Sequence, residues 1–121
     1  MELLVRVVPN GPGPRPPVGT PVRIEVRDVT MQDVASPVVV ATDTRVADVD
    51  DAGDEALVTA VIELADDAVT PQRDLILWAR VGATGAERVA VGDWITMQSI
   101  PVRTTSETAG RPLDVEVRPV R

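Results

Sequence analysis

The chain has 121 residues, which suits a single domain with one hydrophobic core. Its 19 acidic and 12 basic residues give a net charge of −7, which argues against nucleic acid and anionic membranes as partners. The sequence contains neither Cys nor His, so it excludes disulfides, thiolate metal sites and Ser–His or Cys–His catalysis.

The first half of the chain reads as strands separated by turn-forming segments. Residues 3–8 form the first expected strand, and residues 9–20 form a loop rich in Pro and Gly, because proline cannot donate to a ladder. From Val22 to Arg27, apolar and charged residues alternate with the period of two that is typical of a half-buried strand. A third strand, bent near its end, is expected over residues 37–46.

The second half continues the same pattern. The buried face of the strand at 56–64 is expected to hold Val58, Ala60, Ile62 and Leu64. A flexible loop at residues 103–112 precedes the last strand. The further expected strands cover residues 74–81, 87–91, 94–102 and 113–118.

These elements predict an all-β fold. Seven to eight short strands with frequent turn signals, and no sustained helical period, favour one β-sandwich of mostly antiparallel strands over residues 1–121. Valine dominates the apolar residues and favours strands, because its β-branched side chain packs well on a pleated surface.

A candidate partner surface follows from the strand at 74–81, which is apolar on both faces over part of its length. Such a strand is usually central, with one side on the core and the other covered by a loop or a partner. We therefore select Ile76 and Trp78 for this surface, together with Trp94, the other aromatic residue of the chain. Each tryptophan suits a core position or a recognition surface.

The acidic turn before residue 56 is the only candidate cation site. Carboxylates at Asp48, Asp50, Asp51 and Asp54 could converge on a hard cation such as Ca²⁺. An EF-hand alignment fails, however, because Thr59 falls at the last ligand position and the flanks read as strands. A solvated turn that keeps the neighbouring strands soluble is the alternative that this pattern favours.

The sequence also lacks the residues that several other kinds of catalysis require. The chain has no Lys for a Schiff base or a P-loop, and its two aromatic residues could line a sugar cleft only poorly. We therefore expect no enzyme activity and no cofactor. A Pro-x-x-Pro match at Pro14 to Pro17 is also explained by a plain loop.

The run from Val22 to Val39, with Asp28-Val29-Thr30 and then Asp33 before Pro37, resembles the YbaY/YscW-like lipoprotein family. Similar pieces follow in the same order at Val61–Leu64 and Leu75–Val81, and in Asp93 with Ile100-Pro101-Val102, so the resemblance covers about residues 20–103. It implies a compact β-sandwich. Members of that family include pilotin-like chaperones that assist secretin assembly in type III secretion.

The sequence therefore predicts a non-enzymatic binding or assembly module with an exposed sheet face or edge. Its expected partner is another protein or a second copy of itself, with no nucleic acid and no membrane insertion. The alternative is a sandwich that binds a small ligand, a carbohydrate or a cation. Residues 1–9 do not read as a signal peptide, which predicts a cytoplasmic location, or the envelope if the native N-terminus is longer.

Overall fold

A computed structural model describes the chain over residues 2–11, 15–30, 38–47, 56–64, 74–82, 93–96, 100–102 and 113–120. Strands are the only regular elements among these residues, which confirms the all-β prediction. The predicted strand at 87–91 and the predicted loop at 103–112 lie outside the described residues. The strands are β1 (Glu2–Pro9), β2 (Pro21–Asp28), β3 (Val38–Arg45), β4 (Val58–Glu63), β5 (Leu75–Val81), β6 (Trp94–Ile95), β7 (Ile100–Val102) and β8 (Leu113–Pro119).

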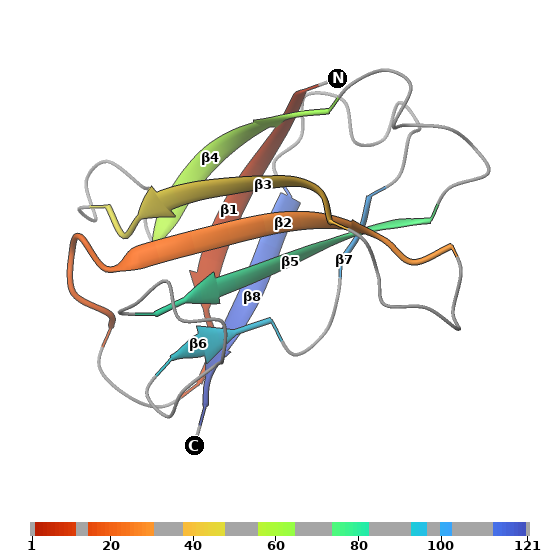
Figure 1. The fold of residues 1–121 in the computed structure, drawn as a ribbon. Helices are drawn as coiled ribbons and strands as arrows, with labels where there is room; N and C mark the ends of the chain where they lie inside the picture. Colours follow the sequence, from red (N-terminus) through yellow and green to blue (C-terminus); the bar gives the residue numbers. More distant parts are fainter. Residues whose placement is uncertain are drawn as a thin grey trace.

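The strands form one continuous sheet in the order β3-β2-β5-β6-β8-β1-β4, and β7 pairs with β5 beside this path. All pairs are antiparallel except β1 with β8, which confirms the mostly antiparallel prediction. The expected two-sheet sandwich needs a correction, because the sheet is a single one that curls into a barrel-like shape. In Figure 1, β2, β3 and β5 pass in front of β1 and β8 and run across them.

The short strand β6 explains the difference from a sandwich. Its Ile95 lies opposite Arg80 of β5, and its Trp94 lies opposite both Val81 of β5 and Pro119 of β8. Two residues therefore join the β3-β2-β5 half to the β8-β1-β4 half. The alternation of buried and exposed residues along a strand is the same in two stacked sheets and in one curled sheet. The sequence pattern therefore could not predict that β6 pairs with both β5 and β8.

The two halves of the sheet enclose one core. Alternate residues point inward along every long strand apart from β3, as the period of two requires. The expected inward face of β4 is confirmed for Val58, Ile62 and the adjoining Leu64, which are buried, while Ala60 is half-buried. The fully enclosed side chains include Leu3, Val5, Val7, Val22, Ile24, Val26, Leu57, Leu77, Val115 and Val117.

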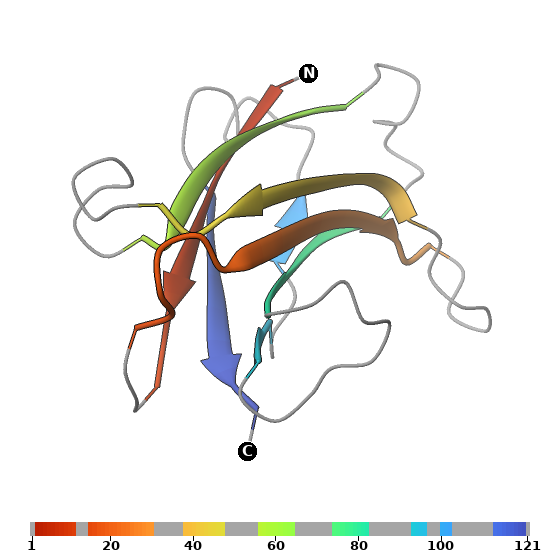
Figure 2. The same ribbon diagram turned by 60° about the vertical axis from the view of Figure 1, so that its left-hand side comes forward.

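The strands β3 and β4 form the two ends of the sheet and approach each other at one point. The Ala47 N–H, just after β3, donates to the Leu57 carbonyl, just before β4, at 2.8 Å. Figures 1 and 2 show the two strands diverging from there. Among the described residues, the sheet is therefore nearly closed at this corner, and its two end strands separate beyond it.

The described part of the Pro-rich connection is tied to this corner. The Arg15 guanidinium donates from Nη2 to the Ala56 carbonyl at 3.0 Å and to the Ala47 carbonyl at 3.4 Å, and Pro16 is buried. Gly19 has a φ of 92°, a conformation that favours glycine. These contacts fit a structural loop better than an extended ligand for another domain.

Candidate functional site

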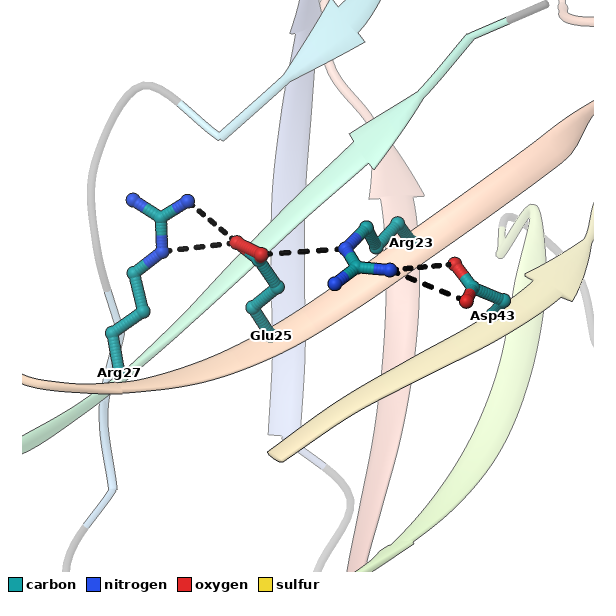
Figure 3. Close-up of polar contacts among 4 residues, drawn as sticks. All are labelled: Arg23, Glu25, Arg27 and Asp43. Carbon is teal, nitrogen blue, oxygen red and sulfur yellow. Dashed lines mark hydrogen bonds and ion pairs between the residues drawn. The ribbon is translucent and has the colours of Figure 1, made fainter. Parts of the chain in front are cut away.

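The outward side of β2 carries a row of charges. Arg23, Glu25 and Arg27 occupy alternate positions of the strand, so their side chains share one face, and Asp43 of β3 lies opposite Arg23. Figure 3 shows Glu25 between the two guanidinium groups. We call the outward side chains Arg23, Glu25, Arg27, Asp43, Ile76, Trp78 and Arg80 the β2–β5 outer face.

Glu25 is the centre of this row and is only 5% exposed although it carries a charge. Arg27 donates to its Oε1 from Nε at 3.0 Å and also from Nη2, and Arg23 Nε donates to its Oε2 at 3.4 Å. A buried carboxylate is tolerated when cations and hydrogen bonds satisfy it in this way. The two arginines thus make burial of Glu25 possible.

Arg23 also connects β2 to the end strand β3. Its Nη1 donates to both carboxylate oxygens of Asp43 at 3.3 Å. The hydrogen bond to Glu25, with a smaller contribution from the charge of Asp43, raises the pKa of Arg23 above its ordinary value despite partial burial. Arg23 therefore stays cationic, and the two arginines and two carboxylates of Figure 3 balance in charge.

Trp78 and Ile76 supply the apolar part of the β2–β5 outer face. Trp78 lies opposite Glu25 across the β2–β5 ladder, Ile76 lies opposite Arg27, and both are half-buried. The Arg27 guanidinium carbon lies 4.6 Å from the centre of the Trp78 ring, within the range of a cation–π contact. The ring is therefore held in place by a guanidinium that Glu25 also holds.

A second ion pair flanks the tryptophan. Arg80 Nη2 donates to Asp93 Oδ2 at 3.1 Å, and both side chains are largely buried. Gly82 makes room for this carboxylate, because a Cβ there would lie 2.5 Å from Asp93 Oδ1. Arg80 also lies opposite Arg23 across the ladder, so pairing each cation with a carboxylate relieves the repulsion between them.

The structure separates the residues selected from the sequence. Ile76 and Trp78 share the outer face, whereas Trp94 is 7% exposed and packs in the core. Asp48, Asp50, Asp51 and Asp54 lie outside the described residues. The alternation predicted that Arg23, Glu25 and Arg27 share the outward face of their strand, but not that they form ion pairs with one another. The signal for these ion pairs was the alternation of positive and negative charge at every second residue.

The different positions of the two tryptophans lead to a spectroscopic prediction. Trp94→Phe, which leaves only Trp78, should give red-shifted emission that acrylamide quenches efficiently. Trp78→Phe should give blue-shifted emission that resists quenching, because Trp94 is buried. Equal quenching in two folded variants would contradict these positions, and folding is checked by far-UV circular dichroism.

The described residues contain neither a cluster of metal ligands nor a helix that could span a membrane. No three His, Cys, Asp or Glu side chains in this part of the chain come together as metal ligands could. In the same residues, no helix has the length and apolarity needed to cross a membrane. The β2–β5 outer face combines one aromatic ring with three arginines, each of which pairs with a carboxylate. This composition suits recognition of a partner.

Comparison with known proteins gives one informative likeness. No family model matches the chain, and no curated protein matches its sequence. The chain is similar in structure to an alternative pilotin from the type II secretion system of Vibrio cholerae, with a TM-score of 0.73 and 16% sequence identity. The match covers 100% of this chain and 97% of the pilotin. The chain therefore has a pilotin-like fold, while the YbaY/YscW-like resemblance stays a prediction.

Proposed function

We propose that the chain is a non-enzymatic helper of a secretion system that binds a protein partner, as a pilotin does. The observation that most strongly supports the proposal is the structural match to a pilotin over nearly the full length of both chains. A shared fold does not by itself transfer a function, so the proposal also draws on the character of the β2–β5 outer face.

We place the partner on this face, around Trp78. Tryptophan and arginine are the residues most often found to dominate binding energy at interfaces. Here the ring and the Arg27 guanidinium stack, and Glu25 fixes the guanidinium, so binding would immobilise few additional side chains. The named side chains of this face include three arginines and two carboxylates, whereas the chain as a whole is acidic, with a net charge of −7.

Affinity capture from extracts of the native host tests this proposal. The wild-type chain is immobilised beside two variants, Trp78→Ala and the matched control Arg118→Ala, which alters an exposed residue of β8. We expect one secretion-system protein to bind the wild type and Arg118→Ala in stoichiometric amounts. Loss of a central aromatic anchor should weaken that binding by at least about 30-fold, which corresponds to about 2 kcal/mol.

The outcomes separate the proposal from the small-ligand alternative. A thermal-shift screen of the same protein against cations, sugars and nucleotides should show no stabilisation, whereas saturating binding of a ligand would raise stability by more than about 1 kcal/mol. A ligand that stabilises the fold, with no protein retained, would replace our proposal. If the partner bound Trp78→Ala as tightly as it binds the wild-type chain, the interface would have to lie on another surface.

A further inference from the structure

We propose that Asn10, just after β1, is a site of spontaneous deamidation, in which water converts its side-chain amide into a carboxylate and ammonia is released. Asn10 is the only asparagine of the chain, and Gly11 follows it directly. Asn10 lies beside β8, away from the β2–β5 outer face, so its chemistry is independent of the proposed function.

The reaction needs only this pair of residues and water. The backbone nitrogen of Gly11 attacks Cγ of Asn10, the Cγ–Nδ2 bond breaks, and Nδ2 leaves as ammonia with the proton of the Gly11 N–H. Water then opens the succinimide ring at either of its two carbonyl carbons, which gives aspartate or isoaspartate. A glycine at position 11 favours the attack, because no side chain shields its nitrogen.

The fold itself requires the glycine that makes Asn10 labile. Gly11 has a φ of 129°, a backbone conformation that favours glycine. A Cβ at this position would also lie 2.9 Å from Cδ of Pro119, closer than such atoms normally approach. Gly11 is exposed and Asn10 is only half-buried, so water can reach the reacting atoms.

Glu116 of β8 holds the amide group that the reaction removes. Asn10 Nδ2 donates to Oε2 of Glu116 at 2.9 Å, and the Asn10 backbone N–H donates to the Val117 carbonyl at 2.8 Å. Because Nδ2 leaves as ammonia, the hydrogen bond to Glu116 must break during the reaction. Glu116 therefore slows deamidation of the folded chain.

Deamidation changes this contact from attractive to repulsive. A carboxylate at position 10 has no hydrogen to donate, and it would lie beside the Glu116 carboxylate, where like charges destabilise a strand pair. Arg118 lies two residues further along the same outward face of β8 and offsets part of this repulsion. We therefore expect the modification to weaken the end of the β1–β8 ladder.

Prolonged incubation of the purified chain at mildly alkaline pH, followed by peptide mapping with mass spectrometry, tests the site. The peptide that contains residue 10 should gain the mass difference between an NH₂ and an OH group, with aspartate and isoaspartate as products. Glu116→Ala should deamidate about two- to tenfold faster than the wild type, the effect expected from losing one exposed hydrogen bond. Glu116→Gln is the matched control, which keeps an acceptor and should deamidate at about the wild-type rate.

Two results of this incubation would overturn the proposal. The first is a folded chain that stays unmodified while the same chain, unfolded in guanidinium chloride, deamidates at residue 10. The second is an equal rate in Glu116→Ala and the wild type, which would remove Glu116 from the account. Isoaspartate should be found at position 10 alone, since no Asp of the chain is followed by Gly.

The variant Asn10→Asp, which reproduces the aspartate product, measures the consequence for stability. It should lower the urea midpoint of unfolding in the wild-type background. The loss should be smaller in the Glu116→Gln background, where the new amide can donate to the carboxylate at position 10. Arg118 is present in both backgrounds, so its effect cancels. Equal losses in the two backgrounds would contradict the repulsion between position 10 and Glu116.

Discussion

Replacing Leu77 with alanine is expected to lower the free energy of unfolding by about 2–5 kcal/mol, the largest effect of any single change considered for this chain. Leu77 lies on the inward face of β5 and is fully buried. β5 pairs with β2, β6 and β7, so the surrounding strands are held by several ladders and cannot readily collapse into the cavity. Urea denaturation followed by circular dichroism gives this free energy.

The matched control is Leu4→Ala, which removes the same atoms from an outward and partly exposed position. At protein concentrations where the chain is monomeric, its effect should stay below about 1 kcal/mol, because little apolar surface is uncovered. The comparison is valid when both variants keep the wild-type m-value, the slope of the free energy of unfolding against urea concentration. Similar losses for the two substitutions would mean that β5 does not lie against the core as described.

Replacing Glu25 with glutamine is expected to lower the free energy of unfolding by about 1–3 kcal/mol. The amide keeps the shape of the side chain but removes the negative charge that two guanidinium groups share. Removal of one member of a fully buried ion pair costs about 3–5 kcal/mol. Arg23 and Arg27 are both partly exposed and can recover water, so the smaller loss is expected here.

Asp43→Asn provides the control for this prediction. Asp43 also binds Arg23, but it is 74% exposed, and surface ion pairs contribute between about 0 and 1 kcal/mol. Glu25→Gln should also free the Arg27 guanidinium from Trp78, which increases acrylamide quenching in the Trp94→Phe background. If the two carboxylate changes had equal effects on stability, Glu25 would not be the centre of the network.

Most of the fold was predictable from local patterns. The alternation from Val22 to Arg27 specifies the inward and outward faces of β2, and the bounds of β5 agree closely with the expected strand at 74–81. The curling of the sheet was not predictable, because it depends on Trp94 and Ile95 pairing with two strands far apart in sequence. Local alternation carries no information about such long-range pairing.

The candidate site was predictable only in part. Apolar residues on both faces of the strand at 74–81 led to the selection of Ile76 and Trp78, which lie among the outward side chains of β5. Their role in a partner surface stays a prediction. The burial of Trp94 and the position of Asp43 beside Arg23 depend on strand order and register, which a single sequence does not specify. The alternation assigned the charges of β2 to the outward face, yet Glu25, which lies opposite Trp78, is only 5% exposed.

Taken together, the pilotin-like fold and the stacked Arg27–Trp78 pair support one account of function, in which the β2–β5 outer face holds a protein partner in place.

Photo-cross-linking in the native host tests the central claim most directly. A benzoylphenylalanine is placed at position 76, beside Trp78 on the β2–β5 outer face, or at position 118 on β8 as the control. We predict that light captures one secretion-system protein from position 76 and little or none from position 118. Capture of that protein from position 118 with none from position 76 would contradict our assignment of the partner to this face.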